Sequence, residues 1–459
     1  MNKHAQAADD RSQSRRISFV FAALSASLLL TSKSAAQSLN EALVSAYLTN
    51  PALEAQRSAL KATDELLPQA LAGWRPTLAV DAETGLSRID SSFGDGDIST
   101  NAISLTLTQN LYQGGETTAN ISRAELLVRT ERARLGAVEQ DVLVDTVTAY
   151  VGLFTSTRVL ELARQNEARL KKQLVATTDR FTVGEVTKTD IAQAEARLAG
   201  AVADRIQAEG AILAAEATFR NVIKLEPEAL VQPGPLGSMP AGEEEAQTLA
   251  LSTNPNIVLA DANLAASRED VRIAVASLLP SLDLEGTLSH ADEPSITLDR
   301  QSEASATLRL RVPLYQGGGE YAVVRQNKRI VDQRLADLDA ARRAVREGVT
   351  SAWQALMTAR STKDSIKQQV RAATIALEGT RRESEVGERT VLDVLDQESD
   401  LFQAEVDLAS AIGDEVVAGY QLQAAIGQLN IAALELNVEA FDPEPHYQRA
   451  RNRWSGLDD

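Results

Sequence analysis

Acidic side chains lie close to two glycine-containing turns that share one pattern. The turns are Val183-Gly184-Glu185, followed by Asp190, and Val386-Gly387-Glu388, followed by Asp393 and Asp396. Glycine after a long helix permits a sharp reversal of the chain, as at a helix C-cap. Asp393 and Asp396 have i, i+3 spacing and therefore share a helix face. Carboxylates collected in this way can select cations.

The sequence contains an internal repeat, with an offset of about 203 residues between the two copies. Asn50-Pro51 and Asn254-Pro255 each begin a helical stretch. Further on, Leu111-Tyr112-Gln113-Gly114-Gly115 is matched by Leu314-Tyr315-Gln316-Gly317-Gly318, and these glycines predict a strand-to-helix turn in each copy. Matches in the same order at a nearly constant offset indicate a duplicated unit.

Local chemistry offers a second interpretation of two aspartates. Thr187-Lys188-Thr189-Asp190 and Thr390-Val391-Leu392-Asp393 both have the Thr-x-x-acid pattern of a capping box. An acid in the first turn of a helix also interacts favourably with the helix dipole. Asp396 is different, because its counterpart in the first copy is Gln193 and capping there does not require an acid.

Other kinds of chemistry have little material in this chain. It contains no cysteine, and its histidines, His4, His290 and His446, are far apart in sequence. Thiol catalysis and the usual zinc sites are therefore not expected, and we find no Gly-x-Ser-x-Gly, P-loop or dinucleotide motif. A net charge of -18 argues against a nucleic-acid partner. We expect a protein that is not an enzyme and has no cofactor and no metal site.

The N-terminal residues are typical of an export signal. Arg15-Arg16 precede an apolar run from Ile17 to Leu30, and Ser34-Ala35-Ala36 supplies small residues for cleavage. No other stretch is long and apolar enough to span a membrane as a helix. The expected organisation is a signal peptide (1–36), a first repeat (37–232), a second repeat (233–430) and a polar C-terminal tail (431–459).

Each copy contains two segments in which apolar and polar residues alternate. They predict four strands, at about 77–89, 102–112, 281–289 and 303–314. The polar segments 91–100 and 291–301 are expected to be loops. One apolar and one polar face suit a soluble sandwich and an outer-membrane barrel equally well.

A very long helix is expected after each pair of strands. Residues 116–183 and 320–386 contain no proline, and a helix of this length extends about 100 Å. A soluble coiled coil would explain these helices but would leave the four amphipathic strands without a role. Strands in lipid must close into a barrel, and the smallest barrels have about eight strands. Four strands per chain therefore require several copies.

Together, the export signal, the duplicated units and the Leu-Tyr-Gln-Gly-Gly and Val-Gly-Glu motifs resemble the TolC family of outer-membrane export channels, over about residues 38–430. The resemblance implies an α+β membrane protein: a homotrimeric, 12-stranded outer-membrane β-barrel with four strands per chain, continued by a long periplasmic α-helical barrel. The implied partners are a periplasmic adaptor (membrane fusion) protein, an inner-membrane ABC or proton-driven pump, and outer-membrane lipid. The tail from Asp442 to Tyr447, with Trp454, resembles members that serve type I protein secretion.

The resemblance also implies a periplasmic gate at the two Val-Gly-Glu turns. Arg389 and Asp190 match family positions whose links between protomers hold the aperture closed. Around a threefold axis, Asp393 and Asp396 would form two stacked carboxylate rings. The family has a tyrosine where this chain has Ser384, so we expect a closed state held by fewer links.

The expected function is that of a passive exit duct for proteins or small-molecule drugs, opened at its periplasmic end by the adaptor and the pump. The alternative is a periplasmic coiled-coil structural or adaptor protein without a membrane pore. Dependence on detergent distinguishes the two.

Overall fold

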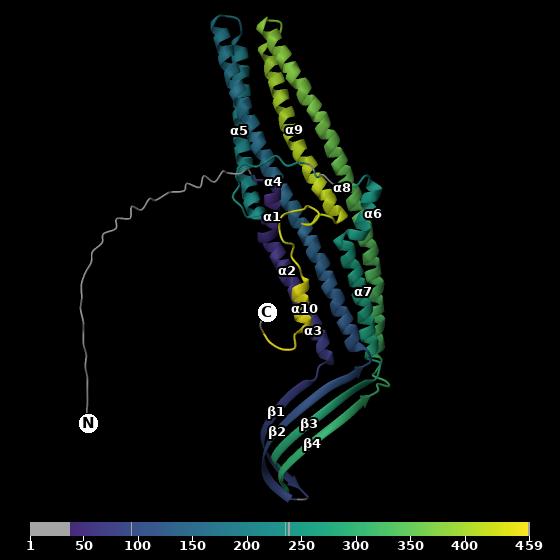
Figure 1. Ribbon diagram of the computed structural model, residues 1–459. Helices are drawn as coiled ribbons and strands as arrows, with labels where there is room; N and C mark the ends of the chain where they lie inside the picture. The colour runs from purple at the N-terminus through teal and green to yellow at the C-terminus, as the bar shows by residue number, and fades with distance from the viewer. Residues whose placement is uncertain (1–36, 93, 235, 237–238, 458–459) are drawn as a thin grey trace, which may run out of the picture. The chain divides into compact units, whose positions relative to one another are not determined.

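The computed structural model describes residues 37–457 except 93, 235, 237 and 238, and the predicted signal peptide lies outside this range (Figure 1). The first repeat comprises α1 (Leu39–Thr49), α2 (Pro51–Asp64), α3 (Leu66–Leu71), η1 (Ala72–Trp74), β1 (Thr77–Ser91), β2 (Gly94–Gln113), α4 (Glu116–Thr182) and α5 (Lys188–Ile223). The second comprises α6 (Glu243–Thr253), α7 (Pro255–Ala276), β3 (Ser281–Ser295), β4 (Leu298–Arg311), α8 (Gly319–Glu385) and α9 (Val391–Ile426), and α10 (Glu444–Asn452) follows.

The duplication is visible in the lengths and starts of the helices. The long helices α4 and α8 each have 67 residues, and their partners α5 and α9 each have 36. Asn50 and Asn254 cap α2 and α7 in the same way, because each side chain accepts from a backbone N–H two residues on and a proline occupies the first turn. No helix within the described ranges is both long enough and apolar enough to cross a bilayer.

The four strands form one antiparallel sheet in the order β1-β2-β3-β4. The expected loops at 91–100 and 291–301 were wrong, because the strands continue through most of both segments. Polar side chains pair across the hairpins there: Arg88 Nε lies 3.6 Å from Asp97 Oδ1, and Arg300 Nε lies 3.2 Å from Asp292 Oδ1. Composition alone therefore predicted strands that end too early on the hairpin side.

The register gathers apolar side chains on one face of the sheet. Leu78 is opposite Leu107, and Val80 is opposite Leu105, which in turn is opposite Leu288. On the same face, the apolar side chains that remain exposed are Leu78, Val80, Leu86, Ile103, Leu107, Leu284, Leu288, Leu308 and Leu310. Among the described residues, nothing covers this face.

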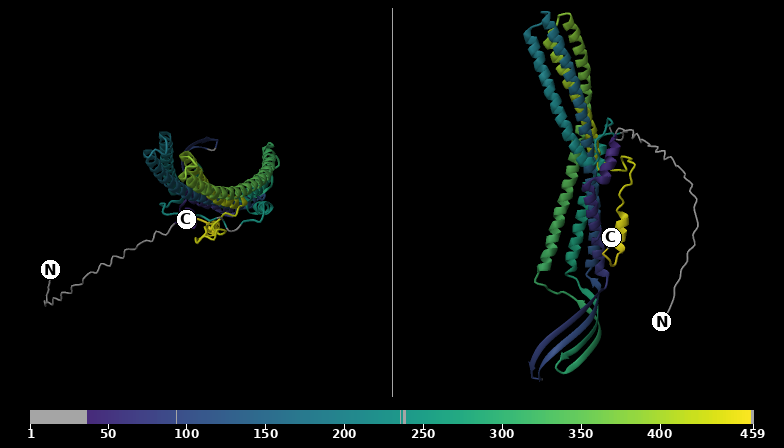
Figure 2. Two further views of the ribbon diagram at one scale, coloured as in Figure 1. Left: turned by 90° about the horizontal axis from the view of Figure 1, so that it is seen from above. Right: turned by 90° about the vertical axis from the view of Figure 1, so that its left-hand side faces the viewer.

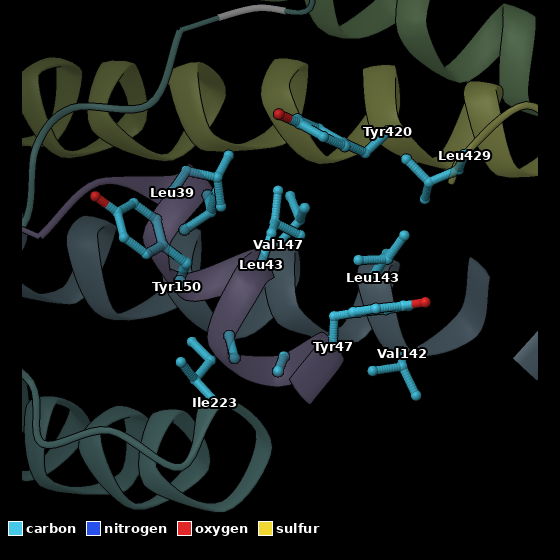
Figure 3. Packing of buried hydrophobic residues seen from close by; sticks show 14 of the residues in the cluster. Leu39, Leu43, Tyr47, Val142, Leu143, Val147, Tyr150, Ile223, Tyr420 and Leu429 are labelled. Atoms are coloured by element: carbon cyan, nitrogen blue, oxygen red, sulfur yellow. The ribbon is translucent and has the colours of Figure 1, made fainter. Parts of the chain in front are cut away.

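The largest apolar core lies where the first-repeat helices meet α9 (Figure 3). Tyr150 of α4 is fully buried in it, and its hydroxyl lies 2.7 Å from the carbonyl oxygens of both Gln37 and Val231. These carbonyls flank a short parallel bridge between Gln37 and Leu230. Burial raises the pKa of Tyr150 to about 12, so the hydroxyl stays protonated and available as a donor.

The residues after α9 are structured rather than a merely polar tail. Leu429, Ile431 and Leu436 are buried in the first-repeat core, although they follow the second repeat. α10 then packs on α2 and α3. In Figure 2, viewed from above, this segment lies on the convex side of the arc that the long helices make.

Candidate functional site at the hairpin tips

Two helical hairpins, α4/α5 and α8/α9, end in tips that lie side by side far from the sheet (Figure 1). At the first tip, Gly184 has φ +81° and donates its N–H to Phe181 O at 3.0 Å. Glu185 N–H donates to Arg180 O at 3.0 Å, which completes a Schellman motif. Gly387 has the same φ at the second tip. Both tips therefore reverse the chain at glycine in a left-handed conformation.

The apolar residue of each turn points into solvent. Val183 is 71% exposed and Val386 is 73% exposed. Glu185 and Glu388 are exposed as well. Each tip therefore presents a small apolar surface next to an acidic residue, and no other part of the described chain covers it.

Asp190 and Asp393 both act as helix caps. The Oδ2 atom of Asp190 accepts from Thr187 N–H at 2.7 Å, and that of Asp393 accepts from Thr390 N–H at 2.9 Å. Each threonine hydroxyl in turn accepts from the backbone N–H of its aspartate, so both capping boxes are complete. The structural interpretation of these two aspartates therefore accounts for their contacts within the chain.

The pKa of the Asp393 carboxyl lies below its usual range. Hydrogen bonds from the Thr390 backbone are the main cause, followed by the Thr390 hydroxyl and the nearby Arg389 charge. Asp393 therefore remains a carboxylate at neutral pH while it caps α9.

Asp396 has a partner that sequence reasoning missed. Arg197 Nη2 of α5 lies 2.5 Å from Asp396 Oδ1 of α9, and both side chains are about half exposed. The pair links the two hairpins near their tips. Asp396 is thus a paired carboxylate and not a bare one, which changes the charge expected of the second acidic ring.

Arg389 also has a partner within its own hairpin. Its Nε lies 3.0 Å from Glu383 Oε2, on the last turn of α8. Links from Arg389 and Asp190 to other protomers remain a prediction, and forming them would compete with the Glu383 pair and the α5 capping box. Ser384 is engaged through its backbone, because its carbonyl accepts from Gly387 N–H at 3.2 Å.

Small apolar side chains hold the hairpins together just behind the tips. Val391 and Leu395 of α9 are buried with Ala194 of α5 and Leu170 of α4. Next to them, Glu398 is only 2% exposed and pairs with Arg381 at 2.7 Å. The charged residues of the tips therefore lie next to a small apolar cluster, and the buried carboxylate of Glu398 lies beside it.

The predicted strand-to-helix turns lie at the other end of the long helices. Gly114 and Gly115 have φ values of +62° and +88°, and Gly317 and Gly318 have +76° and +86°. A Cβ on Gly114 would come within 2.7 Å of the carbonyl oxygen of Ala276, so this turn needs glycine for space as well as for conformation. Among the described residues, no three His, Asp or Glu side chains gather as a metal site would require.

A comparison of the two copies contains the signal that would have found Arg197. Its counterpart in the second copy is Asp400, just as the counterpart of Asp396 is Gln193. The copies thus differ by a basic residue in one and an acidic residue in the other, at positions one helical turn apart. Glu383, the partner of Arg389, carries the same kind of signal, because its counterpart in the first copy is Arg180.

Residues 42–223 and 247–428 each match the model of the outer membrane efflux protein family. The chain belongs to this family. Outer membrane efflux protein BepC of Brucella suis is 32% identical over 435 residues, which is 95% of each chain. Outer membrane protein TolC of Vibrio cholerae is 26% identical over 421 residues, covering 90% of this chain and 95% of the other.

The fold of this outer membrane efflux protein agrees with a solved channel. The Campylobacter jejuni CmeC outer membrane channel superposes with a TM-score of 0.77 at 15% identity, over 90% of this chain and 89% of that one. The family match covers residues in both halves of the chain, and the family resemblance is confirmed.

Proposed function

We propose that this outer membrane efflux protein is the outer-membrane duct of a tripartite export system. Three copies would form a 12-stranded barrel, continued into the periplasm by a helical barrel. The observation that carries the proposal is the sheet register, which leaves one apolar face exposed on four strands long enough to cross a membrane.

The exposed face has the composition of a lipid contact. Leu78 is 66% exposed, Leu288 is 56% exposed and Leu310 is 63% exposed. The opposite face carries charge, and Arg309 Nη2 there lies 3.0 Å from Glu285 Oε2. Apolar side chains toward lipid and charged pairs toward water give the alternation expected of a barrel strand.

The edges of the chain favour a closed ring of copies. β1 and β4 each have one unpaired edge, which in lipid would leave backbone groups without partners. The helical part also has exposed apolar side chains on two different helices, Ile206 and Leu213 on α5, and Leu335 and Ile375 on α8. Two different complementary edges produce a ring when the rotation between copies closes.

The hairpin tips are the proposed periplasmic gate. They carry Asp393 and the Arg197–Asp396 pair, and their exposed Val183 and Val386 offer contacts for a partner. An adaptor that binds there would relax the packing between hairpins, with energy supplied by an inner-membrane ABC or proton-driven pump. The cargo, proteins or small molecules, would be selected by that pump.

Three measurements test the proposal. The purified protein should require detergent, have the mass of three chains, and conduct ions in planar bilayers. A water-soluble monomer without conductance would instead support a periplasmic coiled-coil protein. Family membership argues against that alternative, because the family is one of outer membrane efflux proteins.

A further inference from the structure

The C-terminal strap, residues 441–457, is fastened to the helices nearest the sheet. His446 Nδ1 lies 2.8 Å from Asp64 Oδ2, and the Asp64 side chain is only 1% exposed. Arg132 donates to Glu444 at 3.0 Å, and its guanidinium lies 5.0 Å from the centre of the Tyr447 ring. Burying a carboxylate without a partner is strongly unfavourable, so the His446 contact specifies one docked position.

This fastening brings the chain end to the start of β1. Beyond α10, Arg453 Nη1 lies 4.0 Å from Glu65 Oε1 on the helical side. The Arg75 guanidinium then stacks 4.7 Å from the Trp454 ring centre. Arg75 almost directly precedes β1, which begins at Thr77. Trp454 is therefore placed at the junction between helices and sheet.

The strap leaves its last large side chains uncovered. Trp454 is 72% exposed, and Leu457 is fully exposed. Exposed aromatic side chains stand near the same junction on other elements: Trp74 is 43% exposed, Tyr112 46% and Tyr315 78%. Trp and Tyr at one level, next to an apolar band that begins at Leu78, are typical of a membrane–water interface.

We propose that Trp454 and Leu457 insert into the periplasmic leaflet of the outer membrane, so that the strap is a peripheral anchor that sets the depth of the sheet. The proposal rests on the proposed function, because the sheet must lie in the membrane. The convex position of α10 fits this role, since a ring of copies turns that side outward (Figure 2).

The exposed side chains of the strap would contact lipid at the boundary between headgroups and acyl chains. Tryptophan and the long stem of arginine both suit that boundary, where an apolar body and a polar tip are solvated together. The segment 441–459 has no excess of positive charge, because Arg449, Arg451 and Arg453 stand against four acidic residues, Asp442, Glu444, Asp458 and Asp459. Insertion therefore depends on the apolar side chains, and an increased fraction of anionic lipid should not strengthen it.

Tryptophan fluorescence tests the anchor directly, because the chain has only Trp74, Trp353 and Trp454. In the variant Trp74→Phe plus Trp353→Phe, Trp454 is the sole reporter. The full-length protein is placed in nanodiscs of phosphatidylcholine brominated either near the headgroup or near the chain ends. We expect strong quenching by the shallow bromines and weaker quenching by the deep ones. Equal emission with and without bromine would overturn the proposal.

A second reporter separates the anchor from the proposed function. A chain whose only tryptophan is Leu78→Trp reports the apolar face, and Leu308→Trp replaces it if that variant does not fold. Quenching of the sheet reporter without quenching of Trp454 would refute the proposed anchor but not the membrane placement of the sheet. Absence of quenching at both sites sinks the membrane placement as well.

The fastening can be tested in the same way. With Trp454 as the sole tryptophan, His446→Ala should reduce the shallow quenching, because the strap loses the partner of Asp64. Arg449→Ala is the matched control, since Arg449 is exposed on α10 and forms no ion pair within the described residues. Unchanged quenching in His446→Ala would refute the positioning role of the strap.

Discussion

Arg197 and Asp396 join the two halves of a duplicated chain. Their side chains meet at 2.5 Å between α5 and α9, although they are 199 residues apart in sequence. The equivalent positions with the copies exchanged are Asp400 and Gln193, which cannot form an ion pair. A contact of this kind between the two copies therefore contains an ion pair only when α5 supplies Arg197 and α9 supplies Asp396.

Replacing Arg197 should change selectivity far more than stability. Exposed ion pairs contribute about 1 kcal/mol or less, so Arg197→Gln should fold normally. The freed Asp396 carboxylate should raise cation selectivity and strengthen block by multivalent cations in single-channel recordings. Asp396→Asn should have the opposite effect, and the swap Arg197→Asp plus Asp396→Arg should restore wild-type behaviour.

Arg158→Gln is the matched control for this series, because Arg158 pairs with Glu161 on its own helix. If Arg197→Gln and Arg158→Gln gave the same selectivity, the pair would have no part in the gate.

The glycine at each hairpin tip is needed for its backbone conformation. Gly387 has φ +81°, and a Cβ there would meet nothing within 4 Å. Gly387→Ala should therefore destabilise the tip by about 1 kcal/mol through backbone strain alone. Hydrogen exchange around Val386 would measure the change.

Gly348 gives the comparison for this prediction. It also has open space around it, but it lies inside α8 without a positive φ. Gly348→Ala should be stabilising, by up to about 1 kcal/mol, because alanine is the better helix former. Changes of the same sign at both glycines would contradict the conformational argument.

Acid should loosen the second tip. The pKa of Asp393 is lowered by its Thr390 hydrogen bonds, so its charged form stabilises the fold above the ordinary pKa of about 3.9. That contribution is lost as the pH falls through the lowered value. Protease cleavage at the tip should therefore rise steeply in strong acid, and Asp393→Asn should be cleaved more than wild type near neutral pH, with the difference shrinking on acidification.

Asp204→Asn serves as the control, since Asp204 is exposed within α5 away from the tip. The capping explanation fails if Asp393→Asn and Asp204→Asn respond to pH alike.

Much of the architecture was predictable because it rests on periodic patterns. The expected long helices at 116–183 and 320–386 match α4 and α8 within one residue, since proline-free apolar periodicity leaves few alternatives. The hairpin ends were not predictable from composition, because Asp, Ser and Gly there pair across strands. The Arg197–Asp396 contact depends on how α5 packs beside α9, and no local pattern reports that packing.

The tail illustrates another limit of sequence reasoning. Its proline and charged residues indicated a polar segment, yet Ile431 and Leu436 are buried in the core that the first-repeat helices form with α9. A few apolar residues without regular spacing do not indicate which part of the protein they pack against. Only the fold brings them to that core.

Removing His446 should release the strap in a pH-dependent manner. Burial raises the pKa of Asp64, while the contact with His446 opposes that shift. A raised folded pKa means stability that is present in acid and lost as the pH rises through that value. His446→Ala should therefore weaken docking by about 2 kcal/mol at neutral pH, less than for a fully buried pair because His446 is partly exposed, and by less near pH 4.

Limited proteolysis of the tail at the two pH values measures this effect. Adding Asp64→Asn to His446→Ala should restore protection, because the neutral amide has no charge to bury. Equal cleavage of His446→Ala at both pH values would rule out the buried carboxylate as the cause.

The unpaired edges of β1 and β4 have a consequence for biogenesis. The largest apolar core lies within one chain, but the outer edges of β1 and β4 have no partner strand among the described residues. In the proposed ring of copies, the sheet is completed by association of chains, and the rate of that step should rise with protein concentration, unlike the folding of the hairpins. Before that association, each newly exported chain would have two unpaired strand edges, and a periplasmic chaperone would act on those edges.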